Sequence, residues 1–129
     1  MLRRIVVLAA ALVAAAAVAS TGGASGGGVR VSATASPTCP VERVPPDPSC
    51  APKPVDVRVR VAARPGGRTV ARARTGSDGR VSIPLRSGRY RVYARAANGG
   101  SLPRCDYKDV RVPRGRYVRV AISCDTGIR

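Results

Sequence analysis

The sequence predicts an all-β domain, a single antiparallel β-sandwich of six or seven strands stapled by disulfides. From Val55 onward, apolar and polar residues alternate with a period of two, which is typical of strands with one buried face. Gly, Pro, Asn and Asp interrupt the alternation at short intervals, as turns between strands do. No helical pattern follows Ala19, and the cysteine count is four, an even number that suits disulfides in an exported domain.

The N-terminal segment predicts export. Residues 1–19 carry Arg3 and Arg4, an apolar run from Ile5 to Ala19, and small residues at its end, as a cleaved signal peptide does. The run is shorter than the roughly 20 residues that span a bilayer. We expect a product that is secreted or held in the cell envelope, outside the cytoplasm. Residues 20–38 are rich in Gly, Ser and Ala and are predicted to be a flexible tether, which leaves residues 39–129 as the domain.

The cysteines are predicted to pair with their nearest neighbours. Cys39 and Cys50 flank a proline-rich loop, whereas Cys105 and Cys124 bracket a candidate hairpin. The second pair requires an irregularity near Pro103, because Cys105 and Cys124 have opposite strand parity. Each bridge is expected to contribute about 2 to 4 kcal/mol. A zinc site is the rival hypothesis, but the spacing is too wide and histidine is absent, so we predict no metal and no cofactor.

The first half of the domain is predicted to contain two strands, each followed by a turn. The strand at residues 55–63 has its valines on one face and Asp56, Arg58 and Arg60 on the other. Pro65–Gly67 turns the chain. Residues 68–74 form a poorer strand whose facing stays open, because Val70 and Ala71 lie on opposite sides. Asp78–Gly79 is a hairpin signal.

Four further strands are predicted. Residues 80–85 place Val81, Ile83 and Leu85 inward, and Pro84 favours an edge or a bulge. Residues 89–96 alternate again. Two final strands, at residues 107–112 and 116–122, are predicted to form a hairpin that shares one apolar face.

Two turns carry a family resemblance. Thr75–Gly79 followed by Val81, and Leu85–Gly88 followed by Tyr90, resemble turns of the carboxypeptidase regulatory-like modules, which are transthyretin-like, Cna-B-like or Ig-like sandwiches. The four cysteines and the tail resemble those of small secreted actinobacterial proteins. The resemblance implies the fold and no activity. Some Cna-B-like modules form a Lys–Asn crosslink, which we do not expect here.

Enzymatic chemistry is predicted to be absent. There is no histidine to serve as the base of a nucleophilic triad, and no carboxylates cluster with the spacing of metal ligands. The Asp125-Thr126-Gly127 motif of aspartic proteases is followed by only two residues, too few to build the supporting loop and strand. The better hypothesis for it is a cap or a C-terminal docking contact.

Positive charge is the strongest compositional signal. The chain has 23 Lys and Arg against 7 Asp and Glu, a formal charge of +16, which attracts polyanions without a shaped pocket. The candidate polyanion-binding residues share the outward parity of their strands; they are Arg58, Arg60, Arg89, Arg91, Arg95, Arg111 and Arg119.

Three interpretations of the domain's role remain open. The first is a non-catalytic binding or structural module retained at an anionic envelope polymer or a membrane surface. The second is a protein-interaction module that docks another envelope protein through a sheet edge or the tail, residues 125–129. The third is that arginine only solvates the sheets, as the default surface residue of a GC-rich coding genome. Sequence-specific nucleic acid recognition is not expected, because there is no recognition helix.

Overall fold

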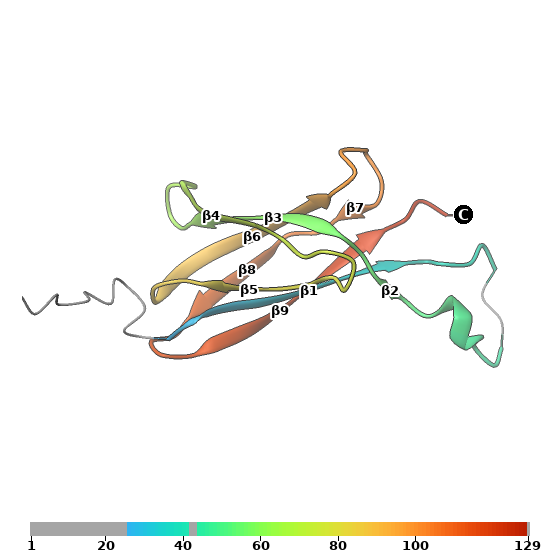
Figure 1. Ribbon diagram of the computed structural model, residues 1–129, viewed down its shortest axis with the longest axis horizontal. Coiled ribbons are helices and arrows are strands. Elements are labelled where there is room, and N and C mark those ends of the chain that lie inside the picture. The colour runs from blue at the N-terminus through green and yellow to red at the C-terminus, as the bar shows by residue number, and fades with distance from the viewer. Residues whose placement is uncertain (1–25, 42–43, 129) are drawn as a thin grey trace, which may run out of the picture.

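The computed structural model describes residues 26–41 and 44–128, so the predicted leader lies outside the described residues. These residues form two packed β-sheets and one short 3-10 helix (Figure 1). The elements are β1 Gly28–Ser36, η1 Pro48–Cys50, β2 Lys53–Pro54, β3 Val57–Ala63, β4 Thr69–Arg74, β5 Arg80–Pro84, β6 Gly88–Ala96, β7 Arg104–Cys105, β8 Lys108–Val112 and β9 Tyr117–Asp125. The predicted all-β sandwich is confirmed, but the described residues contain nine strands instead of six or seven, because β1 and the short strands β2 and β7 were not predicted.

The two sheets differ in strand direction. Sheet B has the order β4-β3-β6-β8, and all its neighbours are antiparallel. Sheet A has the order β2-β1-β9-β7, with β5 paired to β1 as well. Within sheet A, β1 and β9 run parallel over their whole length, from Gly28 opposite Tyr117 to Ser36 opposite Asp125. The sandwich is therefore mostly, but not entirely, antiparallel.

The prediction of a flexible tether over residues 20–38 is wrong for its second half. Gly28–Ser36 is β1, which lies between β9 on one side and β2 and β5 on the other. Its alternating residues Val29, Val31, Ala33 and Ala35 are buried. β1 is therefore paired along both edges, and the domain includes residues well before Cys39.

Two predicted hairpins are wrong for a common reason, namely that the chain changes sheet at both turns. The turn containing Asp78–Gly79 leads from β4 in sheet B to β5 in sheet A. The turn between β8 and β9 likewise crosses, so β8 pairs with β6 and β9 pairs with β1. Turn residues mark where a strand ends, but they do not say which sheet the next strand joins.

The predicted irregularity beside Cys105 is a change of sheet. β7 pairs with β9 and places Cys105 opposite Cys124. Asp106 still follows β9, because its backbone N–H donates to Ser123 O at 3.0 Å. The chain then enters β8 in sheet B. Both predicted disulfides, Cys39–Cys50 and Cys105–Cys124, are present.

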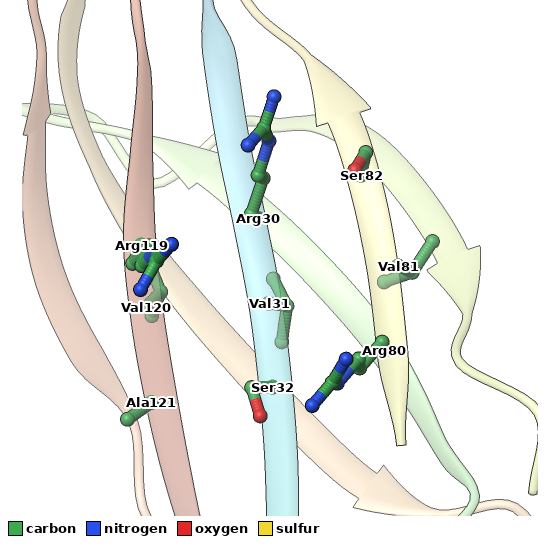
Figure 2. Close-up of a pocket in the computed structure, with 9 residues that line it drawn as sticks. All are labelled: Arg30, Val31, Ser32, Arg80, Val81, Ser82, Arg119, Val120 and Ala121. Atoms are coloured by element: carbon green, nitrogen blue, oxygen red, sulfur yellow. The ribbon is translucent and has the colours of Figure 1, made fainter. Parts of the chain in front are cut away.

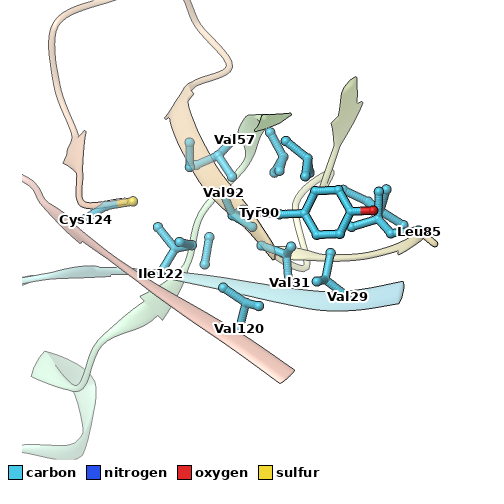
Figure 3. Packing of buried hydrophobic residues seen from close by; sticks show 14 of the residues in the cluster. Val29, Val31, Val57, Leu85, Tyr90, Val92, Val120, Ile122 and Cys124 are labelled. Atoms are coloured by element: carbon cyan, nitrogen blue, oxygen red, sulfur yellow. The ribbon is translucent and has the colours of Figure 1, made fainter. Parts of the chain in front are cut away.

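The core lies between the sheets and is built mainly from valine (Figure 3). Tyr90 is the one aromatic ring in the core cluster, and its hydroxyl donates to Arg86 O at 2.7 Å. The largest fully buried side chains of the core are Val29, Val31, Val57, Val59, Val61, Val92, Val112 and Ile122. Branched side chains of this kind pack well on a pleated surface.

As predicted from Pro84, β5 is an edge strand, paired with β1.

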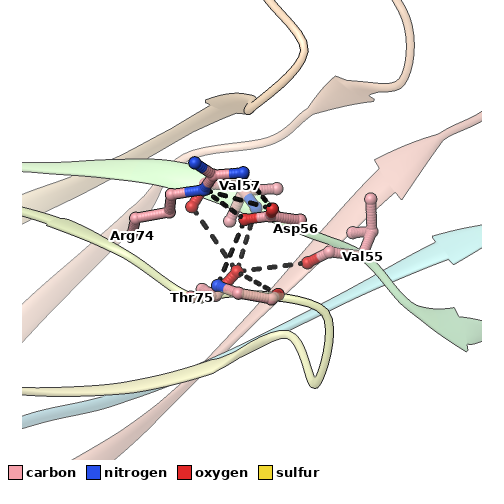
Figure 4. Close-up of polar contacts among 6 residues, drawn as sticks. Val55, Asp56, Val57, Arg74 and Thr75 are labelled. Atoms are coloured by element: carbon pink, nitrogen blue, oxygen red, sulfur yellow. Dashed lines mark hydrogen bonds and ion pairs between the residues drawn. The ribbon is translucent and has the colours of Figure 1, made fainter.

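A buried threonine fastens one crossing turn to the start of β3 (Figure 4). Thr75 follows β4 and is 7% exposed. Its Oγ1 accepts a hydrogen bond from the Val57 N–H at 2.9 Å, and lies 3.1 Å from Gly76 O and 3.3 Å from Val55 O, to which it can donate. Asp56 accepts from the Gly76 N–H at 3.1 Å. The turn is thus held by side-chain hydrogen bonds where strand pairing ends.

Replacing Thr75 tests this polar clasp. Thr75→Val keeps the shape of the side chain but leaves the buried Val57 N–H without its acceptor, so we expect a loss of about 1 to 3 kcal/mol in unfolding free energy. Thr75→Ser keeps the hydroxyl and is expected to cost less, about 1 kcal/mol for the missing methyl group. Urea unfolding of both variants measures the difference, and a larger loss for Ser than for Val would contradict this role.

The positions of the two disulfides revise the expectation from the sequence that each contributes about 2 to 4 kcal/mol, and we now expect unequal contributions. Cys124 is 2% exposed within the core, whereas η1, which contains Cys50, has no buried residue. Replacing Cys105 and Cys124 by Ala should lower the unfolding free energy of the sandwich by about 2 to 4 kcal/mol. The matched pair, Cys39→Ala with Cys50→Ala, should free the loop with little effect on that transition, because a longer flexible loop costs little entropy. Equal losses in urea unfolding would show that the loop belongs to the same cooperative unit.

Candidate functional site: two arginine faces

The outward surface of sheet B carries a dense arginine cluster, here called face B and defined by Arg58, Arg60, Arg72, Arg74 and Arg95. The side chains come from the three neighbouring strands β4, β3 and β6. Strand register places Arg58 opposite Arg74 on one side and opposite Arg95 on the other. Arg60 lies opposite Arg72 and Tyr93. Together they line a shallow hollow on this sheet.

Four arginines of face B form no ion pair within the described residues. Arg58, Arg72 and Arg95 are exposed, and Arg60 is half-buried. Arg74 differs, because it pairs with Asp56 at 2.6 Å. Like charges directly opposite each other across strands are unfavourable. The fold therefore holds a surface whose self-repulsion an anionic ligand would relieve.

Tyrosines lie beside these arginines. The guanidinium carbon of Arg60 is 4.2 Å from the ring centroid of Tyr93, and that of Arg91 is 4.3 Å from the ring centroid of Tyr107. The two rings are themselves 5.9 Å apart. Contacts of this kind contribute about 0.5 to 1 kcal/mol at exposed sites. They fix Arg60 and Arg91 in place next to the less constrained arginines.

Two carboxylates form ion pairs with arginines on or beside face B. Asp109 accepts from Arg91 Nε at 2.7 Å and pairs with Arg64 Nη1 at 2.8 Å. The hydrogen bonds from Arg91, and next the charge of Arg64, lower the pKa of Asp109 below its ordinary value. The pKa of Asp56 is lowered in the same way, chiefly by the hydrogen bonds from Arg74. Both acids therefore stay ionised and committed to these arginines.

A second cluster lies on the outward surface of sheet A and is here called face A, defined by Arg30, Arg80 and Arg119 (Figure 2). Arg30 and Arg119 are register partners on the parallel strands β1 and β9. Ser32 lies opposite Arg80, and Ser82 lies opposite Arg30. All three arginines are exposed, and none forms an ion pair within residues 26–41 and 44–128. Arg30 also lies 5.3 Å from the ring centroid of Tyr117.

The structure divides the seven arginines predicted from strand parity. Arg58, Arg60 and Arg95 meet on face B. Arg91 lies on the same sheet but is paired with Asp109. Arg119 belongs to face A. The remaining two, Arg89 and Arg111, are register partners at the end of sheet B that lies beside Pro113.

Sequence reasoning missed four arginines of the two faces. Arg72 and Arg74 were not predicted because the sequence did not settle which face of β4 is buried. In the structure Ala71 and Ala73 face the core, so Arg72 and Arg74 face outward. Arg30 was assigned to a tether. Arg80 lies at the start of β5, where its neighbour across the sheet is Ser32 of the unpredicted strand β1. The alternation of residues 29–35 was the signal that would have found β1 and Arg30.

The Asp125-Thr126-Gly127 segment docks onto the domain itself. Thr126 Oγ1 donates to Pro37 O at 2.6 Å, and its backbone N–H donates to Ser36 O at 3.2 Å. Asp125 accepts from the Gly127 N–H at 2.9 Å. These bonds extend the parallel pairing of β1 and β9 beyond Ser36. A capping contact, one of the two roles weighed for the motif, accounts for this geometry.

The described part of the chain contains no group of three or more His, Cys, Asp or Glu side chains that suits a metal ion. Among the same residues, no helix has the length and hydropathy needed to cross a bilayer. The chemistry that the arrangement does offer is multiple guanidinium groups on exposed sheet surfaces. Guanidinium groups bind carboxylate and phosphate oxygens in bidentate geometry.

The fold and the two faces define a disulfide-stapled β-sandwich with basic outer surfaces. A solved structure of similar fold is GBS52, the minor pilin of the Gram-positive pathogen Streptococcus agalactiae, with a TM-score of 0.55 and 16% sequence identity. The match covers 77% of this chain and 44% of the pilin chain, so this chain corresponds to less than half of that protein. No family model and no curated protein matches the sequence. At this identity the likeness shows the fold alone.

The pairing of Asp109 predicts a pH-dependent contribution to stability. Because its folded pKa lies below the unfolded value, the contribution is present above about pH 4 and is lost as the pH falls through the folded pKa. Asp109→Asn should therefore be less stable than the wild type at pH 7, and the difference should vanish on acidification.

Urea unfolding at several pH values measures this convergence. Asp78→Asn is the matched control, since it removes the same charge from a turn where Asp78 accepts from the Arg80 N–H and forms no ion pair among the described residues. A difference between wild type and Asp109→Asn that stays constant down to pH 2 would contradict the ion-pair origin.

Proposed function

We propose that the protein is a secreted, non-catalytic β-sandwich module that is retained at an anionic polymer of the cell envelope through face B. The observation that carries this proposal is the in-register row of Arg74, Arg58 and Arg95 across three adjacent strands. Two of its three members, Arg58 and Arg95, form no ion pair in the part of the chain that the structure describes. A polyanion supplies the missing countercharge.

The spacing of face B suits a linear polymer. Arginines two residues apart on one strand are separated by about 6.8 Å, and arginines on neighbouring strands by about 4.8 Å. Arg58 with Arg60, and Arg72 with Arg74, supply the first spacing. A chain with a repeating phosphate or carboxylate meets a guanidinium group at each such step. No deep pocket is needed, and affinity arises from the number of contacts.

Location and fold support the same proposal. Two disulfides favour an oxidising compartment, and the similar fold of a Gram-positive minor pilin favours an extracellular or cell-surface role. The signal peptide over residues 1–19 is part of the proposal. So is the finer assignment to the carboxypeptidase regulatory-like modules, supported by the Thr75–Gly79 and Leu85–Gly88 turns, each of which connects the two sheets.

Binding to poly(glycerol phosphate), a linear phosphodiester chain, tests the proposal. The logarithm of the association constant should fall linearly with the logarithm of salt concentration. Replacing Arg58, Arg72 and Arg95 together by Gln should weaken binding and make this slope shallower by about two to three units. Neutral dextran should not bind.

The matched control removes the same charge from scattered positions, with Gln at Arg68, Arg86 and Arg104, all of which are exposed outside the two faces. It should retain most of the affinity. Equal weakening by both triple variants would mean that net charge, not face B, attracts the polymer. Absence of binding would leave the arginines as solvating residues, and binding to anionic vesicles alone would place the partner at a membrane. Salt-independent capture of a protein would favour docking through a sheet edge or the tail.

A further inference from the structure

The two arginine faces point in opposite directions. Sheets A and B pack against each other through the valine core, so their outward surfaces lie on opposite sides of the sandwich. Packed sheets are about 10 Å apart, and side chains alternate between their two surfaces. Face A and face B therefore cannot form one continuous binding surface on the same side of the molecule.

Both faces carry exposed arginines that form no ion pair among the described residues. Arg30, Arg80 and Arg119 on face A have no ion pair, and neither do Arg58, Arg72 and Arg95 on face B, within the ranges that the structure describes. Ion pairs instead occupy arginines at the margins of sheet B, together with Lys108. Neither face is covered by another part of the described chain, since all six side chains are exposed.

We propose that the protein cross-bridges two anionic polymer strands, one bound to face A and one to face B. This inference rests on the proposed function, because face B must bind such a polymer at all. The addition is a second binding surface that makes a single sandwich bivalent. Bivalent molecules gain avidity on a polymer network, because the second contact forms at high effective concentration.

The chemistry of face A fits the same class of ligand. Arg30 and Arg119 are neighbours on parallel strands, and the hydroxyls of Ser32 and Ser82 lie on the same surface beside Arg80 (Figure 2). Guanidinium and hydroxyl groups together donate hydrogen bonds to phosphate oxygens. With three arginines against five on face B, face A is expected to bind more weakly.

A two-layer capture experiment tests the cross-bridge. Poly(glycerol phosphate) is attached to a surface, the protein is bound to saturation and excess is washed away, and fluorescently labelled poly(glycerol phosphate) is then added at low salt. Wild-type protein should capture the labelled chain. Replacing Arg30, Arg80 and Arg119 by Gln should leave the first protein layer near its wild-type level but reduce capture at least about tenfold, because three charge contacts are lost.

The control variant with Gln at Arg68, Arg86 and Arg104 should capture the labelled chain as the wild type does. Capture by the face A variant at the wild-type level would overturn the proposal. This outcome would also be seen if two copies of the protein paired and presented two B faces. A first layer that forms normally without capture by the wild type would overturn the cross-bridge and leave the proposed function intact. Failure of the first layer to form would overturn both.

Discussion

Close packing of valine side chains between two sheets is the constraint on which the rest of the molecule depends. The long strands present alternate apolar residues to this layer, as β3 does with Val57, Val59 and Val61. The intervening positions must then face outward, and in this chain arginine fills many of them. The two basic faces are thus a direct geometric consequence of the core.

Two of the carboxylates pair with arginines of sheet B. Asp56 engages Arg74 and Asp109 engages Arg91, whereas Arg58, Arg72 and Arg95 form no ion pair among the described residues. Surface ion pairs contribute little to stability, so this placement is better understood through the field that it leaves. A row of uncompensated guanidinium groups raises the local concentration of polyanions near one surface.

Alternation predicted the sandwich and the inward residues, because period-two burial is a local property of strands. The two disulfide pairs were predicted from which cysteines are nearest along the chain, and for Cys105 and Cys124 against their strand parity. It did not predict the sheet that each strand joins. The turns after β4 and β8 carry ordinary turn residues, yet both cross between sheets, since pairing is decided by distant partners. β1 was missed because its Gly, Ser and Ala content resembles a linker, although Val29, Val31, Ala33 and Ala35 alternate as a strand requires. Because β1 was missed, Arg30 of face A was not predicted.

The choice of arginine over lysine fits surfaces that act through several aligned contacts. Lysine occurs at Lys53 and Lys108, neither of which belongs to face A or face B. A guanidinium group stacks on tyrosine, as Arg60 does on Tyr93, and its long apolar stem covers neighbouring strand surface. Its planar donors also engage phosphate or carboxylate oxygens in pairs. Arginines in register can therefore lie flat on the sheet and still present donors outward, which a point-charge ammonium group does less well.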